Sequence, residues 1–304
     1  MNYKKIFRTP RVRATILKAL SFVPDDVMLK LQYWIKTDRR LNLQNPQRFT
    51  EKLQWYKLYY RDPEMIRCVD KYDVRSYVEE LGLGHILNEC YGVYDTAEEV
   101  DFDKLPNQFV LKDTLGGGGN SVIIVKDKAS ADLEAIRTRM KQWVVKRRRV
   151  RGGGREWPYY NGKQHRIIVE KMLLDQDTQD LPDYKLFCFD GKVQCFYVRE
   201  GYASNHDNGV MAFFDKNKNQ LMGVGMDYCN VTRKTLRINE SIDRMFEYAE
   251  ILAARFPHVR VDFYDTKDGI VFGELTFFNA SGYMKFEPDE FDFELGRNFE
   301  LRKY

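Results

Sequence analysis

Two short apolar segments joined by a run of glycines limit the fold of this chain more than any other feature of its sequence. Phe109–Leu111 and Ser121–Val125 are apolar enough to form strands, and Gly116–Gly119 lie between them. A connection this short joins strands as an antiparallel hairpin, because parallel neighbours need a long crossover. The spacing therefore predicts a β-hairpin with a glycine-rich tip.

Lys112 ends the first strand of this hairpin, shortly before the glycines. Glycine backbones can approach a polyphosphate closely and offer it N–H groups, while a lysine ammonium neutralises its charge. A flexible tip alone would explain the glycines but not the lysine. The segment is no Walker loop, because no Gly-Lys-Ser/Thr follows and the next element is a strand. The candidate phosphate-binding residues are Lys112, Gly116, Gly117, Gly118, Gly119 and Asn120.

A second hairpin is predicted near the end of the chain, from Val259–Phe263 and Ile270–Phe278 with a turn at Asp268-Gly269. Each strand carries one acid between large apolar residues, Asp262 and Glu274. We expect the two acids to face the same side of the sheet, where their oxygens could chelate a hard cation. Salt bridges to Arg260 or Lys185 are the alternative, since a buried acid needs a partner.

The rest of the chain predicts further helices and antiparallel strands. We expect residues 12–60 to be mainly helical, and apolar spacing and turn residues place the other elements. These are a helix from Pro63 to Glu80, an extended segment from Ile86 to Val93, a helix from Ala129 to Val145, a strand over Arg166–Glu170, a hairpin from Asp183 to Tyr197 turning at Asp190-Gly191, and a helix over 241–256.

The composition favours a soluble, cytoplasmic protein with a sizeable core. The 304 residues are 43% hydrophobic, and the 31% of charged residues nearly cancel at a net charge of +4. Five widely spaced cysteines without a Cys-x-x-Cys pair indicate reduced thiols, and the four histidines share no spacing typical of a zinc site. No apolar run is long enough to span a membrane.

Two stretches are strongly basic. Residues 4–18 carry Lys4, Lys5, Arg8, Arg11, Arg13 and Lys18. A solvated helical lead-in is the simpler interpretation, and peripheral contact with anionic lipid is the alternative. Residues 146–155 combine lysine and arginines with three glycines, which favours a flexible lid loop. Nucleic-acid binding is disfavoured there, because no aromatic residues interleave the charges.

The lysine–glycine hairpin and the paired-acid hairpin together resemble the two halves of an ATP-grasp site. Arg260–Phe263 and Glu274–Thr276 resemble the metal-binding strands of D-alanine ligase-type enzymes. The chain from about Arg40 to Gly296 resembles the TupA-like ATP-grasp family of bacterial surface-polysaccharide clusters. The residues that carry this resemblance are Asn45-Pro46, Phe49, Glu51–Trp55, Asp70–Tyr72, Val74-Arg75, Leu105–Lys112 and Asp183–Lys185.

This resemblance implies an α+β ATP-grasp fold, in which two lobes with antiparallel sheets enclose the nucleotide. The implied regions are a helical N-terminal region (1–83), a small lobe with the glycine loop and basic lid (84–165), and a large lobe with the adenine hinge and metal-binding strands (166–304).

The resemblance also implies roles for individual residues. Lys112 would contact the α- and β-phosphates, and Gly116–Asn120 would fold over them. Glu170, with the main chain of Lys171 and Met172, would form the adenine hinge. Lys185 would meet the γ-phosphate or an acyl phosphate and Arg260 would face phosphate, both as catalytic residues, while Asp183 belongs with the cofactor-binding residues. Asp262 and Glu274 would hold Mg²⁺, and Asn279 would supply a third contact because Thr276 replaces the usual asparagine.

The implied activity is an ATP- and Mg²⁺-dependent carboxylate–amine ligase that acts through an acyl phosphate. Family members suggest an amino acid or other amine joined to a uronate of a capsule or cell-surface polysaccharide, and the basic loop could hold that anionic acceptor. Two other classes remain open. Asp101-Phe102-Asp103 matches the Asp-x-Asp motif of a glycosyltransferase using a nucleotide sugar, and a non-catalytic nucleotide-binding protein would need the phosphate site alone. A protein kinase is disfavoured, because no His-Arg-Asp or Asp-Phe-Gly is present.

Overall fold

The computed structural model describes residues 15, 17, 19–117, 121–144, 154–160, 163–173, 181–201, 209–227, 231–232 and 234–304. Gly118, Gly119 and Asn120 of the predicted glycine tip lie outside the described residues, as do residues 145–153 of the basic stretch and Cys229. The other four cysteines are free thiols, as predicted.

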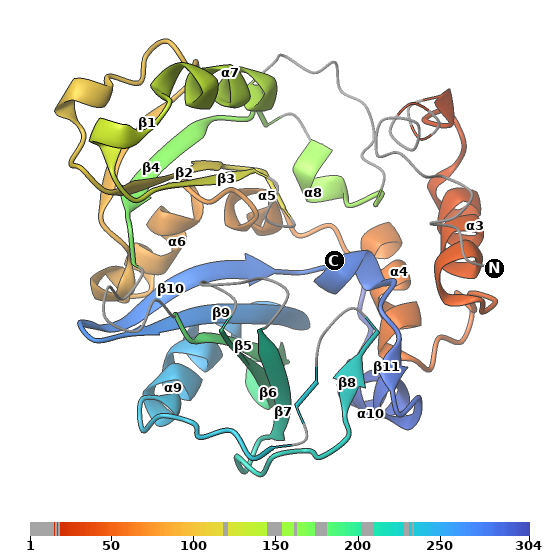
Figure 1. The fold of residues 1–304 in the computed structure, drawn as a ribbon. Helices are drawn as coiled ribbons and strands as arrows, with labels where there is room; N and C mark the ends of the chain where they lie inside the picture. Colours follow the sequence, from red (N-terminus) through yellow and green to blue (C-terminus); the bar gives the residue numbers. More distant parts are fainter. Residues whose placement is uncertain are drawn as a thin grey trace.

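The first of two main sheets contains the lysine–glycine hairpin (Figure 1). Its strands are β1 (Cys90–Tyr94), β2 (Phe109–Asp113), β3 (Val122–Val125) and β4 (Ile167–Lys171), in the antiparallel order β1-β4-β2-β3. Helix α7 (Leu133–Val144) covers one face of this sheet. Phe109 and Leu111 of β2 pack on that side against Met140 and Trp143 of the helix.

The alternation of β2 and β4 turns a second set of side chains to the opposite face of this sheet. Because Lys112 pairs with Ile168 and Val110 pairs with Glu170, these four residues share the face away from α7. The lysine of the predicted phosphate site therefore points away from the core of its own lobe.

The second sheet has the order β10-β9-β5-β6-β7 and is also antiparallel. Figure 1 shows it below the first sheet, with helix α9 (Ile242–Ala253) on its lower side. Its strands are β5 (Asp183–Phe189), β6 (Lys192–Glu200), β7 (Val210–Asp215), β9 (His258–Thr266) and β10 (Gly269–Thr276). A small sheet pairs β8 (Gly225–Met226) with β11 (Phe286–Glu287), and α10 (Glu290–Asn298) follows.

The N-terminal region is helical, with α3 (Asp25–Thr37), α4 (Phe49–Tyr59), α5 (Glu64–Cys68) and α6 (Val74–Glu80). Phe49 of α4 lies against Phe189 and His258, with ring centroids 5.7 and 4.9 Å away. These two residues pair with each other across β5 and β9, so they share one face of the second sheet. The same face carries Lys185 and Asp262 further along these strands. Helix α4 thus covers the apolar end of a face whose other end is polar.

Two predicted elements were wrong in extent. The single helix from Pro63 to Glu80 is broken between α5 and α6, because the Asp70 carboxylate accepts hydrogen bonds from the N–H groups of Tyr72 and Asp73. The predicted strand from Ile86 begins only at Cys90, because Gly84–Ile86 forms a 3₁₀ turn. The remaining short helices are η2 (Phe102–Lys104), η3 (Lys128–Ser130), α8 (Trp157–Tyr160) and η4 (Asn279–Gly282).

The other predicted hairpins and helices are present with small shifts at their ends. The helix expected from Ala129 begins at Leu133, after the turn η3. Strand β4 pairs with β1 and β2, so the chain passes from the first sheet to the second after Lys171 and not at residue 165. Among the described residues, no helix is long and apolar enough to cross a membrane.

Candidate active site

Lys112 and Glu170 meet on the free face of the first sheet. The Lys112 Nζ lies 2.7 Å from Oε2 of Glu170, and Arg75 of α6 lies 3.8 Å from Oε1 of the same carboxylate. The Glu170 side chain is only 9% exposed, so both of its oxygens are occupied by cations in a place with little water. Two cations around one carboxylate leave this face able to accept further negative charge.

The predicted adenine hinge continues from Glu170. The N–H of Lys171 donates to the Glu89 carbonyl, and the Lys171 carbonyl accepts from Asn88 Nδ2, both at 2.9 Å. Glu170 itself pairs with strands on both sides. Met172 is therefore the member of the predicted hinge that lies beyond the sheet pairing.

The base of the glycine loop is tightly built. The Gly116 N–H donates to the Asp113 carbonyl at 3.0 Å, and a Cβ on Gly116 would lie 2.4 Å from the Cβ of Ser121. Only glycine fits at this close approach of the two hairpin arms. Gly117 is surrounded by open space, so the two glycines have different roles.

Lys71 is a site residue to which the sequence analysis gave no role. It lies in the break between α5 and α6, where its N–H donates to the Thr114 carbonyl at 2.9 Å and its Nζ donates to the Gly116 carbonyl. Burial lowers the pKa of Lys71, and the nearby Lys112 lowers it further while Glu274 opposes the change. Lys71 thus contacts the base of the glycine hairpin, and the charges of Lys112 in the first sheet and Glu274 in the second both act on it.

A β-bulge in β10 sets the two predicted metal ligands opposite each other. Phe272 pairs with Phe263, but the register then shifts so that Glu274 pairs with Asp262. Without the extra residue, Gly273, Glu274 would oppose Val261 and face the apolar core. A Cβ on Gly273 would lie 3.1 Å from the Asp262 carbonyl oxygen. The expectation that both acids share one face is confirmed, and the bulge is its cause.

Asp262 is held between two cations. Lys185 Nζ donates to Oδ2 at 2.5 Å, while Arg260 Nε donates to Oδ1 at 2.6 Å and Arg260 Nη2 donates to Oδ2 at 2.7 Å. Asp262 is 2% exposed. Burial alone would raise the pKa of this carboxyl, but the contacts with Arg260 and Lys185 hold it below its usual value. The salt-bridge alternative therefore describes the arrangement of these side chains.

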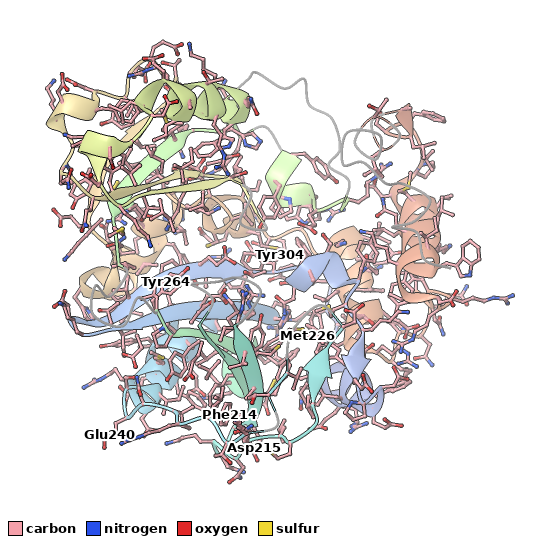
Figure 2. The ribbon with its side chains drawn as sticks, viewed as in Figure 1. Phe214, Asp215, Met226, Glu240, Tyr264 and Tyr304 are labelled. Atoms are coloured by element: carbon pink, nitrogen blue, oxygen red, sulfur yellow. The ribbon has the colours of Figure 1, made fainter. Side chains whose placement is uncertain are left out.

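Asp183 shares Lys185 with Asp262, and it pairs with Arg199 of β6 across the sheet. Its Oδ2 lies 2.9 Å from Lys185 Nζ, whereas its buried Oδ1 has no hydrogen-bond partner among the described residues. Burial therefore dominates and raises the pKa of Asp183. The two acids together raise the pKa of Lys185 although burial opposes this. Tyr264, labelled in Figure 2, pairs with Asp183 at this end of β9.

The donor set fits a hard cation in type. Glu274 Oε1 accepts from Arg260 Nη2 at 3.1 Å and from Thr276 Oγ1 at 2.8 Å, and its side chain is 44% exposed. Asn279 is 2% exposed, yet neither polar atom of its amide has a hydrogen-bond partner in the described part of the chain. Such a buried amide needs an explanation, and a bound ion or ligand is one. Within the described residues, no three His, Cys, Asp or Glu side chains gather closely enough to hold a metal.

Two side chains of α4 hold the turn that follows Asn279. Gln54 Nε2 donates to the carbonyls of Ser281 and Gly282 at 3.0 and 2.8 Å, and Lys57 Nζ donates to the Ser281 carbonyl at 2.8 Å. Ala280, Ser281 and Gly282 all have positive φ, at 43°, 54° and 64°. Consecutive residues in this region are strained, so the contacts from α4 stabilise the turn. Gln54 belongs to the motif Glu51–Trp55, but spacing alone could not have indicated this contact.

The end of the basic stretch is not available to a ligand. Arg155 is 3% exposed, its Nη1 lies 2.8 Å from Asp25 Oδ1, and its guanidinium also donates to the carbonyls of Leu20 and Val23. The expectation that residues 146–155 could together hold an anionic acceptor is therefore wrong for Arg155. This arginine anchors the chain before α3.

The Asp-x-Asp tripeptide lies apart from these residues, in the 3₁₀ turn η2. Asp101 accepts from the Asp103 N–H at 3.1 Å, and its other oxygen lies 3.1 Å from Lys104 Nζ. Both acids are exposed at the surface. They act as a turn-forming pair here, which weakens the glycosyltransferase alternative.

Comparison with known proteins identifies a sequence family. Residues 51–300 match the family described as TupA-like ATPgrasp, which spans more than half of the chain. No curated protein sequence matches the chain.

Solved structures show looser likenesses. D-alanine–D-alanine ligase from Bacillus anthracis has 18% identity and a TM-score of 0.43, and the match covers 69% of this chain and 57% of the ligase. D-alanine–D-alanine ligase from Helicobacter pylori has 14% identity and a TM-score of 0.46, and the match covers 83% of this chain and 68% of the ligase. Biotin carboxylase from Campylobacter jejuni has 13% identity and a TM-score of 0.41, covering 79% of this chain and 48% of the carboxylase. The family of this chain is identified by the sequence match over residues 51–300 and not by these structural likenesses.

We predict different effects for the two paired acids on stability. Asp262→Asn removes the most buried carboxylate of the cluster, leaving Lys185 with Asp183 and Arg260 with Glu274, and should lower the free energy of unfolding by about 3 kcal/mol. Glu274→Gln changes a half-exposed side chain and should stay within about 0.5 kcal/mol of wild type. Urea unfolding of both variants without nucleotide or metal measures this. Equal effects of the two substitutions would contradict the described roles.

A pH dependence should arise from Lys57. Burial lowers its pKa to about 7, whereas the unfolded chain titrates near 10.5. The unfolded state then binds more protons between these values, so stability from this residue rises with pH through that window. The unfolding free energy of wild type minus that of Lys57→Met should rise by about 1 kcal/mol per pH unit between pH 7 and 9. The exposed Lys30→Met is the control, and a constant difference for Lys57→Met would refute the prediction.

Proposed function

The chain belongs to the TupA-like ATP-grasp family, and on this premise we propose that it is an ATP- and Mg²⁺-dependent ligase that forms a carbon–nitrogen bond between a carboxylate and an amine. One observation carries the proposal. Lys71 donates to the Gly116 carbonyl at the base of the glycine hairpin, and the charges of Lys112 in the first sheet and Glu274 in the second both act on it, which supports a single site for phosphates and a metal.

In this proposal ATP lies along the free face of the first sheet. Lys112 and Lys71 are the cations for its phosphates, and Gly116 and Gly117 let the hairpin approach them closely. The adenine is assigned to the hinge at Glu170–Met172, with Met172 as the main-chain contact. A phosphate next to Lys112 would compete with Glu170 for the Lys112 ammonium. Arg75 would then remain as the cation that neutralises the Glu170 carboxylate.

Asp262, Glu274 and Asn279 would hold Mg²⁺, with oxygen donors of the type that this ion prefers. A bound magnesium ion would supply charge neutralisation for the phosphate oxygens. Both oxygens of Asp262 now accept from Lys185 and Arg260. When Asp262 turns to a cation, these two side chains lose a partner and can meet phosphate oxygens. The salt bridges and the metal site are then two states of one cluster.

The proposed reaction begins when the substrate carboxylate attacks the γ-phosphorus of ATP, which gives an acyl phosphate and ADP. The amine then attacks the acyl carbon and displaces phosphate. Lys185 and Arg260 stabilise the negative charge that gathers on the transferring phosphoryl oxygens, and this is electrostatic and positional catalysis. The substrates are proposed to be a uronate of a surface polysaccharide or its precursor and an amino acid or other amine. The free thiols agree with a cytoplasmic location.

We predict that the acyl phosphate can be trapped. Incubation with ATP, Mg²⁺, hydroxylamine and a panel of uronates should give a hydroxamate and an equal amount of ADP. Lys185→Met should lower this rate at least about 100-fold, because a preorganised cation is lost. Lys192→Met, an exposed lysine paired with Glu250, is the matched control and should keep the wild-type rate.

Other outcomes of this assay would count against the ligase. If ADP is released but none of the uronates gives a hydroxamate, the proposed acyl phosphate intermediate is contradicted. Turnover of a nucleotide sugar with Mn²⁺ in the absence of ATP would favour the glycosyltransferase.

A further inference from the structure

Helix α3 has two apolar faces, and the described part of the chain packs against one of them. Its inner face places Leu29 and Tyr33 against Tyr283. On its outer face Val27, Leu31 and Trp34 are 50%, 43% and 46% exposed. Their spacing of four and three residues aligns them in one stripe. Phe22, just before the helix, is 81% exposed. A helix that is apolar on both sides normally contacts something on each of them.

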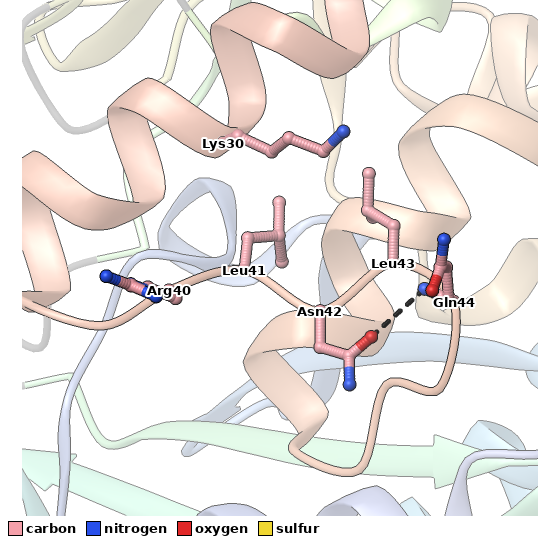
Figure 3. Close-up of a pocket in the computed structure, with 6 residues that line it drawn as sticks. All are labelled: Lys30, Arg40, Leu41, Asn42, Leu43 and Gln44. Atoms are coloured by element: carbon pink, nitrogen blue, oxygen red, sulfur yellow. Dashed lines mark hydrogen bonds between the residues drawn. The ribbon is translucent and has the colours of Figure 1, made fainter.

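A small basic depression lies beside Lys30 of α3 (Figure 3). It has a volume of about 250 Å³ and is lined by Lys30, Arg40, Leu41, Asn42, Leu43 and Gln44. Lys30 comes from α3 itself, one turn before Trp34, and forms an exposed ion pair with Asp26 at 3.6 Å. Arg40 is exposed, and no ion pair to it is seen in the described part of the chain. Two cations thus stand beside the exposed apolar side chains.

The sequence that leads into this helix has the complementary charge for an anionic surface. Residues 1–19 contain Lys4, Lys5, Arg8, Arg11, Arg13 and Lys18 and no aspartate or glutamate. The segment that precedes α3 in the sequence therefore carries six positive charges and no negative one, while the whole chain has a net charge of only +4. Apolar side chains that enter the headgroup region, combined with several lysines and arginines, are the requirements for peripheral binding to anionic lipid.

We propose that the outer face of α3, with Phe22, Val27, Leu31 and Trp34 as apolar anchors and Lys30 and Arg40 as headgroup contacts, binds the surface of a membrane that contains anionic phospholipid. The contact of Arg155 with Asp25 and the carbonyls of Leu20 and Val23 holds the start of α3 to the body of the protein. Binding through α3 would therefore fix the position of the whole protein at the membrane. This proposal is independent of the reaction chemistry.

Vesicle sedimentation with the full chain tests the proposal without ATP or substrate. Wild type should sediment with vesicles of phosphatidylcholine and phosphatidylglycerol, bind pure phosphatidylcholine far less, and lose binding as salt is raised. Leu31→Ser with Trp34→Ser should lower the partition coefficient at least about tenfold. Lys30→Glu with Arg40→Glu should lower it by a similar factor, since each cation near the surface contributes about fivefold.

Matched controls use exposed residues of other elements. Met222→Ser with Ile251→Ser removes side chains that are 57% and 42% exposed, and Lys216→Glu with Lys234→Glu makes the same charge change away from α3. Both controls should bind like wild type, and thermal melts verify that every variant is folded.

Three results would overturn the proposal. Wild type could fail to bind the anionic vesicles, or the α3 variants could bind as well as their controls. Alternatively, light scattering could show that wild type is a dimer which Leu31→Ser with Trp34→Ser dissociates while vesicle binding is unchanged. The stripe would then be an interface between two copies of the chain.

Discussion

The buried carboxylate of Asp262 is the feature on which the arrangement of the second sheet depends. Asp262 is 2% exposed, and burying its charge without a partner would cost free energy of folding. Lys185 neutralises it from the neighbouring strand β5, and Arg260 does so from β9 itself, two residues earlier. The bulge at Gly273 brings Glu274 to the same place. Helix α4 covers the apolar end of this face with Phe49, and the charged cluster forms the other end. One sheet face therefore serves both as core and as candidate active site.

Lys71 and the turn after β10 connect this cluster to the rest of the molecule. Lys71 contacts the glycine hairpin and lies within electrostatic reach of Glu274, so a ligand that changes either sheet changes its surroundings. Gln54 and Lys57 hold the left-handed turn behind Asn279. Ser281 of that turn also donates to Glu156, which follows the buried Arg155. Helix α4 thus supports the turn behind Asn279, and this gives a physical reason for Gln54 in the motif Glu51–Trp55.

Much of the fold and part of the site could be predicted from the sequence because they depend on local patterns. The hairpins around Gly116, Gly191 and Gly269 follow from strand alternation and turn residues, and Asp262 and Glu274 stand out as acids in apolar strands. The break at Asp70 could not be predicted, because a side-chain contact with the following N–H groups competes with a helix of ordinary composition. Lys57, Lys71 and Arg155 find their partners far along the chain, where spacing gives no information. The sequence correctly predicted that Glu274 lies on the same face of the sheet as Asp262. The bulge that causes this is seen only in the strand register.

The central claim is that Lys71 and Lys112 on one side, and Asp262 and Glu274 on the other, form a single site for Mg-ATP. Calorimetric titration of the protein with ATP, with and without Mg²⁺, tests it most directly. Wild type should bind ATP more tightly with Mg²⁺ than without it. Lys112→Ala should weaken ATP binding at least about tenfold, because a charge-assisted contact is lost. Lys126→Ala, which changes an exposed lysine on the same hairpin, should bind ATP like wild type. A wild type that does not bind ATP, or equal binding by Lys112→Ala and Lys126→Ala, would contradict the account.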